Sequence, residues 1–110
     1  KMQDEQMWSL KYTVYGSYVI LAKVPYVNDD KSETPQCLDV ANGSREKGAQ
    51  VITYRENGNA NQRWFFEKQE DGSYLIKSEN SGLYLTYNNG RFTQEEAGKE
   101  NQKWVLEVIK

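Results

Sequence analysis

The sequence contains no histidine and a single cysteine, Cys37, among its 110 residues. Histidine is the commonest general base near neutral pH and a frequent metal ligand, so its absence removes many catalytic and metal-binding arrangements. No Gly-x-Ser-x-Gly segment occurs, and adjacent acids such as Glu95 and Glu96 stand in polar stretches where carboxylates are usually solvated. We therefore predict that the chain is not an enzyme, binds no metal and needs no cofactor.

The sequence also lacks an excess of one charge and any long apolar run. Lys and Arg number 14 against 16 Asp and Glu, and the basic residues are scattered rather than clustered. No apolar stretch approaches the roughly 18 residues that a membrane helix needs, and the N-terminus shows no signal-peptide pattern, so we expect a soluble, mature or trimmed chain. These features predict neither a nucleic-acid partner nor insertion into a membrane.

Only two prolines and eight glycines are present, while aromatic residues make up 13% of the chain. This composition argues against disorder, and the length predicts one domain, residues 1–110. Apolar and polar residues alternate in several segments, as in Trp8 to Val14, and no stretch shows a helical apolar period. We predict an all-β fold with about nine strands, a final strand over Trp104 to Ile109, and a polar loop over residues 25–36.

A repeat is visible in the positions of the tryptophans. The motif Gln-x-Trp occurs at Gln6-Met7-Trp8, Gln62-Arg63-Trp64 and Gln102-Lys103-Trp104. A second marker keeps the same phase, because Gly16-Ser17-Tyr18 begins eight residues after Trp8 and Gly72-Ser73-Tyr74 begins eight residues after Trp64. Two independent landmarks at one spacing indicate internal repetition.

Three short segments carry a family resemblance: Cys37-Leu38-Asp39-Val40, then Gly48-x-x-Val51-x-x-Tyr54, then Asn61-Gln62-x-Trp64. Together they resemble one repeat of the ricin B-type, or R-type, lectin family. The resemblance implies a β-trefoil, in which three four-stranded repeats form a six-stranded barrel capped by three hairpins. It places residues 1–15 at the end of the first repeat, residues 16–71 in the second and residues 72–110 in the third.

This division leaves the chain without most of the first repeat, because only five residues precede Gln6. An open barrel would expose two strand edges and an apolar interior. We expect the strand at Trp8 to pair within the barrel, and the missing strands to come from a neighbouring copy in a homo-oligomer or from a further chain segment. The family also implies that Trp8, Trp64 and Trp104 are buried with pseudo-threefold symmetry.

The family resemblance further implies a sugar site. Its aspartate, its aromatic residue and its Asn-Gln pair correspond to Asp39, Tyr54, Asn61 and Gln62. Carboxylate and amide groups suit sugar hydroxyls, and an aromatic ring offers a flat surface to the C–H face of a sugar. Considered singly, Asp39 could equally be an acid that accepts hydrogen bonds from its own turn, and Tyr54 an ordinary aromatic residue of a strand. The sequence departs from the family at Ile52, where some members carry a polar residue.

In the third repeat Thr86 replaces the aspartate and no aromatic residue stands at the matching place, so we predict that its site is lost although Asn101 and Gln102 remain. Cys37 lacks the partner that many family members carry near Arg55, and we expect it to be a buried thiol. The leading hypothesis is a secreted, cell-surface or periplasmic carbohydrate-binding module whose partner is a glycan, attached to a hydrolase or toxin. The alternative is a non-binding trefoil that serves as a structural or protein-interaction module.

Overall fold

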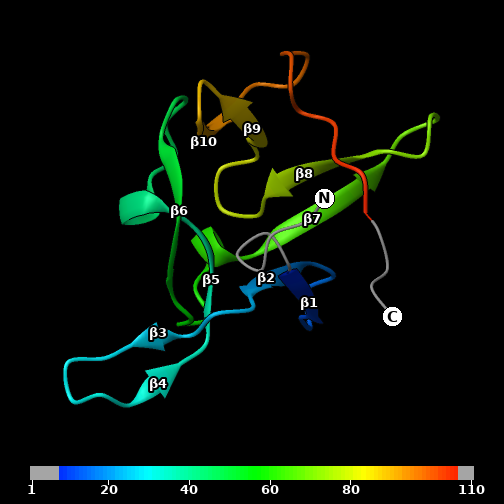
Figure 1. Cartoon of the computed structure of the whole chain (residues 1–110). Helices are drawn as coiled ribbons and strands as arrows, with labels where there is room; N and C mark the ends of the chain where they lie inside the picture. The colour runs from blue at the N-terminus through cyan, green and yellow to red at the C-terminus, as the bar shows by residue number, and fades with distance from the viewer. Residues whose placement is uncertain (1–7, 107–110) are drawn as a thin grey trace.

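The computed structural model describes residues 8–106, which form an all-β domain (Figure 1). The strands are β1 (Trp8–Tyr12), β2 (Tyr18–Ala22), β3 (Tyr26–Val27), β4 (Glu33–Thr34), β5 (Gln36–Val40), β6 (Gln50–Arg55), β7 (Trp64–Lys68), β8 (Tyr74–Ser78), β9 (Tyr84–Asn88) and β10 (Arg91–Glu95). Two short 3-10 turns are present: η2 (Ala41–Gly43) lies in the connection between β5 and β6, and η3 (Ala60–Gln62) follows β6. The predicted all-β class is therefore confirmed, with ten strands in the described part instead of about nine.

Eight strands form one sheet in the order β1-β2-β5-β6-β10-β9-β8-β7, and β7 also pairs with β2. The extra pairing is made by Tyr18 and Trp64, whereas Leu21 of β2 pairs with Cys37 of β5. The start of β2 therefore pairs with β7, and its end pairs with β5, the first strand of the β5–β6 hairpin. The expected pairing of the strand at Trp8 is confirmed, because β1 lies antiparallel to β2 along its whole length.

The core collects apolar side chains from six strands. Its buried members are Ile20, Leu38, Val40, Val51, Trp64, Ile76 and Leu85. Each apolar side chain removed from water contributes about 1.5 to 3 kcal/mol before its entropy cost. The alternation within β5 and β6 places Leu38, Val40 and Val51 on this inner face, and it leaves Asp39 and Tyr54 on the other.

The Gly-Ser-Tyr markers form equivalent turns. Gly16 and Gly72 have positive φ angles of 84° and 89°, which glycine adopts without strain. Ser17 and Ser73 follow them and are buried, and each accepts a backbone hydrogen bond from four residues upstream, at 2.9 Å from Thr13 and 2.8 Å from Gln69. The sequence repeat is therefore also a structural repeat.

The prediction that all three tryptophans are buried is wrong for Trp8. Trp64 is fully buried, Trp104 is half-buried, and Trp8 is 38% exposed. Trp64 and Trp104 make matching hydrogen bonds from Nε1 to the carbonyl oxygens of Leu38 (3.3 Å) and Leu85 (3.2 Å). Trp8 differs because all five residues of β1 are exposed and β2 is the only described strand that pairs with β1.

Two other local predictions need correction. The segment 25–36 contains the hairpin of β3 and β4, because the Asn28 amide donates hydrogen bonds to the Ser32 carbonyl (3.1 Å) and to Thr34 Oγ1 (2.8 Å) across it. The strand predicted over Trp104 to Ile109 is a single bridge between Trp104 and Tyr74, and residues 107–109 lie outside the described part. Gln6 of the first Gln-x-Trp motif also lies outside it.

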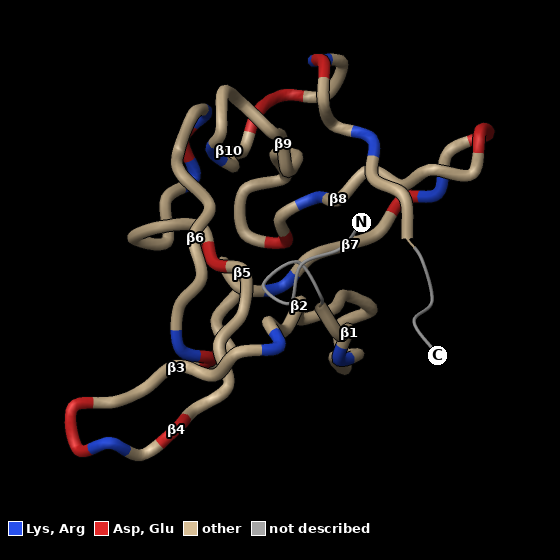
Figure 2. Tube along the Cα trace, in the orientation of Figure 1, with Lys and Arg blue, Asp and Glu red and all other residues tan. Residues whose placement is uncertain are grey.

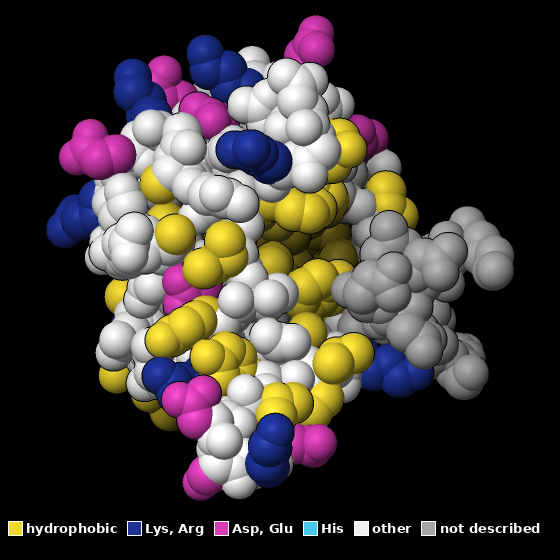
Figure 3. Space-filling model, turned by 60° about the vertical axis from the view of Figure 1, so that its left-hand side comes forward, with side chains coloured by type: hydrophobic (Ala, Val, Ile, Leu, Met, Phe, Trp, Pro, Cys, Tyr) yellow, Lys and Arg dark blue, Asp and Glu magenta, His cyan; other side chains and the backbone are white. Residues whose placement is uncertain are grey.

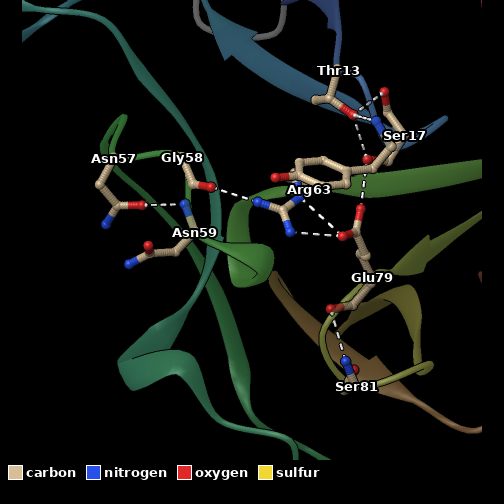
Figure 4. A network of polar contacts seen from close by, with 10 residues as sticks. Thr13, Ser17, Asn57, Gly58, Asn59, Arg63, Glu79 and Ser81 are labelled. Atoms are coloured by element: carbon tan, nitrogen blue, oxygen red, sulfur yellow. Dashed lines mark hydrogen bonds and ion pairs between the residues drawn. The ribbon is translucent and has the colours of Figure 1, made fainter.

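A polar network joins three segments that are distant in sequence (Figure 4). Arg63 donates hydrogen bonds to Glu79 from Nη2 at 2.7 Å and from Nε at 3.0 Å, and its guanidinium lies 4.2 Å from the centre of the Tyr15 ring. The other oxygen of Glu79 accepts a hydrogen bond of 2.6 Å from Ser17. Because side chains of Arg63 and Glu79 are 14% and 17% exposed, this ion pair is well shielded from water.

Charged residues of both signs are interspersed along the described chain, without a basic stripe (Figure 2). Residues 8–106 contain no helix with the length and apolar character needed to cross a membrane.

Candidate sugar site

Three of the four predicted site residues meet in one hydrogen-bonded group. Asp39 is the fourth of the five residues of β5, and Asn61 and Gln62 lie in η3. Gln62 donates a hydrogen bond of 2.8 Å from Nε2 to Asp39 Oδ2, and Asn61 donates one of 3.3 Å from Nδ2 to Asp39 Oδ1. Each carboxylate oxygen thus accepts one hydrogen bond from a side-chain amide.

The same two amides also bind the backbone of the β5–β6 hairpin. Gln62 Nε2 donates to the Arg55 carbonyl at 2.8 Å, and Gln62 Oε1 accepts a hydrogen bond of 2.8 Å from the Asn57 backbone. Asn61 Nδ2 donates to the Val40 carbonyl at 3.0 Å. The hydrogen-bonding groups of Gln62 are therefore engaged, which fixes its amide orientation and the position of the Asp39 carboxylate.

Asp39 is only 4% exposed, and its burial raises the pKa of the carboxyl group above its ordinary value of 3.8. The hydrogen bonds from Gln62 and Asn61 act in the opposite direction because they favour the ionised form. An ionised carboxylate offers about four acceptor positions, of which these amides use two. Asp39 therefore retains acceptor capacity for hydroxyl groups.

Tyr54 lies on the same face of the hairpin as Asp39, one cross-strand diagonal away. Asp39 stands opposite Ile52, and Tyr54 stands opposite Cys37. The Tyr54 side chain is 37% exposed, and its ring packs edge-on against Tyr26 of the β3–β4 hairpin with centroids 5.7 Å apart. The structure places Tyr54 beside the hydrogen-bonded group, and the contacts of its ring are with Tyr26 and Arg55 rather than with Asp39.

Cys37 is fully buried on β5, the strand that also carries Asp39, and it is a free thiol. Burial raises the pKa of the thiol to about 12, and the charges of Glu56 and Asp39 add to the shift. A thiol of this kind is unreactive, because the thiolate is the nucleophile. The expectation of a buried, unpaired cysteine is confirmed.

The third repeat reproduces the hydrogen bonds of the glutamine in the second repeat, without the carboxylate. Gln102 donates from Nε2 to Thr86 Oγ1 at 3.0 Å and to the Glu96 carbonyl at 2.7 Å, and its Oε1 accepts a hydrogen bond of 3.1 Å from the Lys99 backbone. Thr86 is buried, like Asp39. The two glutamines therefore hold equivalent hairpins in the same way, one through an acid and one through a hydroxyl.

A depression of about 400 Å³ lies beside Thr86, and the sequence analysis missed it. Its lining is polar with one aromatic ring, and comprises Thr86, Tyr87, Asn88, Asn89, Glu95, Lys99, Glu100 and Asn101. The strand register explains why the depression is polar. Thr86 pairs with Thr93 as Asp39 pairs with Ile52, so Glu95, two residues after Thr93, occupies the place that Tyr54 holds in the second repeat. No group of three or more Cys, Asp or Glu side chains within residues 8–106 is arranged to hold a metal ion.

The model of the ricin-type β-trefoil lectin domain-like family matches residues 4–97 of the sequence. This chain belongs to that family. The match covers the hydrogen-bonded group at Asp39 and most of the third repeat, and the family is one of lectin-type, carbohydrate-binding domains.

Solved structures place this lectin-like domain among trefoils. ThreeFoil, a designed protein with threefold symmetry, is 30% identical with a TM-score of 0.81, over 97% of this chain and 75% of that one. An exo-β-1,3-galactanase from Clostridium thermocellum is 32% identical with a TM-score of 0.74, over 94% of this chain and 22% of that one. The lectin of Polyporus squamosus, solved with a bound glycan epitope, is 22% identical with a TM-score of 0.67, over 93% of this chain and 35% of that one, and shows the fold alone.

Proposed function

We propose that this lectin-like domain binds a glycan through one site formed by Asp39, Tyr54, Asn61 and Gln62. Asp39 would accept hydrogen bonds from two neighbouring sugar hydroxyls, and Asn61 and Gln62 would hold its carboxylate in position. The exposed part of the Tyr54 ring would pack against the C–H face of the same sugar. The chain's own role would be binding without catalysis.

The observation that carries this proposal is the comparison of Asp39 with Thr86. A buried carboxylate is costly to desolvate, and a hydroxyl at the equivalent place accepts the same glutamine hydrogen bond at 3.0 Å. The fold therefore does not require a charge at position 39. A ligand with hydroxyl groups would explain why a carboxylate with unused acceptor positions stands at the place of the family's sugar-binding aspartate.

A single shallow site of this kind binds weakly, because a sugar must give up water around its hydroxyls. We expect a Kd on the order of 0.1 to 1 mM for a monosaccharide, with higher avidity only when several sites act together. Attachment to a hydrolase or toxin outside the cytoplasm is part of the proposal. The galactanase supports this setting, because the match occupies 22% of a glycan-cleaving enzyme.

A second candidate function is that of a structural or protein-interaction module, and exposed apolar side chains on β1 favour it. Trp8, Leu10 and Tyr12 are 38%, 44% and 67% exposed. Separately, Figure 3 shows a hollow lined by apolar side chains on one face of the molecule. We propose that a strand from a neighbouring copy or from a further chain segment covers β1 and completes the barrel. This role is compatible with sugar binding, since Asp39 lies on a different hairpin.

Glycan-array binding tests the proposed sugar site directly. The unaltered protein, displayed multivalently, is expected to bind a defined group of glycans, and Asp39→Ala is expected to remove that signal. Thr86→Ala is the matched control, because it truncates the equivalent residue of the third repeat and should leave the signal unchanged. A signal that survives Asp39→Ala, or the absence of any signal from the unaltered protein, would contradict the proposal.

A further inference from the structure

Arg55 lies at the outer end of the proposed site and is held there by neighbouring side chains. It is the last residue of β6, next to Tyr54. Its guanidinium carbon lies 5.2 Å from the centre of the Tyr26 ring and 5.4 Å from the centre of the Tyr54 ring. Nη2 donates a hydrogen bond of 3.2 Å to the Tyr54 hydroxyl, and Nη1 donates one of 3.5 Å to Asn28 Oδ1. Two rings and two hydrogen bonds thus orient one planar cation.

This cation has no carboxylate partner among residues 8–106. The ion pairs of that region are Lys11–Glu56, Lys47–Glu96, Arg63–Glu79, Lys77–Glu67 and Lys103–Asp71, and none includes Arg55. Asp29 is near enough for its charge to raise the pKa of Arg55, although the Tyr54 hydrogen bond is the larger cause. Asp30 instead accepts hydrogen bonds from the hydroxyl and backbone of Ser32.

Arg55 also retains hydrogen-bond donors for a ligand. A guanidinium carries five N–H groups in a fixed fork, and the two hydrogen bonds above use two of them. The residue is exposed, and the planar fork matches the two oxygens of a carboxylate. The acceptors that Arg55 does contact, a tyrosine hydroxyl and an asparagine carbonyl, carry no charge.

The backbone carbonyl of Arg55 and the carboxylate of Asp39 accept hydrogen bonds from the same side chain. Gln62 Nε2 donates to the Arg55 carbonyl and to Asp39 Oδ2, both at 2.8 Å. The guanidinium reaches the hydroxyl end of Tyr54, which is the end of that side chain farthest from the backbone. A sugar that bonds Asp39 and packs against Tyr54 would therefore present its outer rim to Arg55.

We propose that Arg55 makes this site selective for acidic glycans, in which a carboxylate on the bound sugar or its neighbour pairs with the guanidinium. This inference rests on the proposed sugar site and adds the class of its ligand. The hairpin of β3 and β4 takes part, because Tyr26 and Asn28 hold the cation at the rim. Sulfate esters share the anionic chemistry and can also bind a guanidinium. The proposal commits to the carboxylate, whose two oxygens the planar fork can bind at once.

Isothermal titration calorimetry with matched sugars tests the proposal. The pairs are galactose with galacturonic acid, mannose with mannuronic acid, and glucose with glucuronic acid, together with galactose 6-sulfate. One of these pairs should contain the sugar that the site accepts. Within that pair, we expect the acid to bind about twofold to fivefold more tightly than the neutral sugar at low salt. The difference should shrink in about 0.5 M NaCl, because salt screens exposed charges.

Variants of Arg55 separate its charge from its packing. Arg55→Gln is expected to remove the preference for the acid while retaining binding of the neutral sugar. Arg55→Lys, which keeps the charge without the planar fork, should retain part of the preference. Arg91→Gln, an exposed arginine on β10, is the matched control and should change neither affinity.

The outcomes distinguish this inference from the proposal beneath it. Equal binding of the acid and the neutral sugar overturns the role of Arg55, and so does a preference for the acid that persists in Arg55→Gln. In either case the sugar site itself stands if Asp39→Ala abolishes the binding of both sugars. Tighter binding of the sulfate than of the uronic acid overturns the choice of carboxylate. Binding of none of these sugars, or binding that Asp39→Ala does not alter, overturns the site itself.

Discussion

Gln62 donates a hydrogen bond of 2.8 Å to the buried carboxylate of Asp39. Gln102 makes the corresponding bond to the hydroxyl of Thr86 at 3.0 Å. The same hairpin structure therefore holds an acid in one repeat and a neutral hydroxyl in the next. The hydrogen bond to the glutamine serves the fold in both repeats, whereas the negative charge of Asp39 is a feature that a ligand would use.

The ring of Tyr54, rather than its hydroxyl, is expected to contribute most to binding of a neutral sugar. Tyr54→Phe keeps the flat apolar surface and should change the affinity less than threefold, whereas Tyr54→Ala removes that surface and should weaken binding about tenfold or more. Titration calorimetry measures both. Tyr87→Ala on β9 is the control, since Tyr87 is a comparably exposed tyrosine of the third repeat; equal losses for Tyr54→Ala and Tyr87→Ala would argue against the assignment.

Binding should weaken in acid at a higher pH than an ordinary aspartate would predict. The ionised carboxylate of Asp39 is the form that accepts hydrogen bonds from sugar hydroxyls, and burial raises its pKa above 3.8. Affinity for a neutral sugar should therefore fall as the pH drops through a midpoint above 3.8. Asn61→Ala removes a hydrogen bond that lowers this pKa, so its midpoint should lie higher still. A midpoint at or below 3.8 in the unaltered protein would count against a buried Asp39 as the acceptor.

The Arg63–Glu79 pair should stabilise the fold at neutral pH and lose this effect in acid. The hydrogen bond from Arg63 is the main cause that lowers the pKa of Glu79 below its ordinary value of 4.5. Its stabilisation is thus present above 4.5 and is lost as the pH falls through the depressed pKa of the folded state. Glu79→Gln should reduce the free energy of unfolding by about 1 to 3 kcal/mol at pH 7, with a smaller difference well below pH 4.5.

Denaturant unfolding at several pH values measures this effect. Lys103→Gln is the control, because Lys103 and Asp71 form an ion pair in which both side chains are more than half exposed. Such pairs contribute little, so the control should unfold like the unaltered protein. Equal stability of Glu79→Gln and the unaltered protein at pH 7 would show that the network in Figure 4 is not a source of stability.

The exposed face of β1 should be covered in solution. If a second copy supplies the cover, size-exclusion chromatography with mass detection should give a multiple of 12.8 kDa. Leu10→Asp places a charge on the exposed strand and should shift the mass toward one copy, whereas Tyr87→Asp, on a hairpin away from β1, should not. A stable, strictly single-copy species would argue against cover by a neighbouring copy and would favour a further chain segment.

The sequence predicts the repeated elements well because they depend on local markers. Gly16 and Gly72 need positive φ angles, and Trp64 must fill the core where the strands meet, so both features recur at a fixed spacing. The grouping of Asp39 with Asn61 and Gln62 is implied by the family resemblance, and the structure brings the three together because η3 returns beneath the hairpin.

Other features depend on contacts that no motif describes. Trp8 carries the motif of a core tryptophan, and its exposure depends on which strands lie next to β1. Arg55 is an unremarkable residue at a strand end in the sequence, and its position at the site depends on Tyr26 in the β3–β4 hairpin. The presence of the aromatic residue Tyr26 in the polar segment before β5 was the one signal for this in the sequence.

The most direct test of the sugar site is an NMR titration that follows the side-chain amide signals of Asn61 and Gln62. Addition of the sugar identified on the array should shift both pairs of signals with one Kd, and these shifts should vanish in Asp39→Asn while the spectrum otherwise remains that of a folded protein. Shifts confined to Asn88 and Asn101 would place binding in the third-repeat depression and contradict the assignment. An unchanged spectrum at about 10 mM sugar, well above the expected Kd, would contradict sugar binding by this chain.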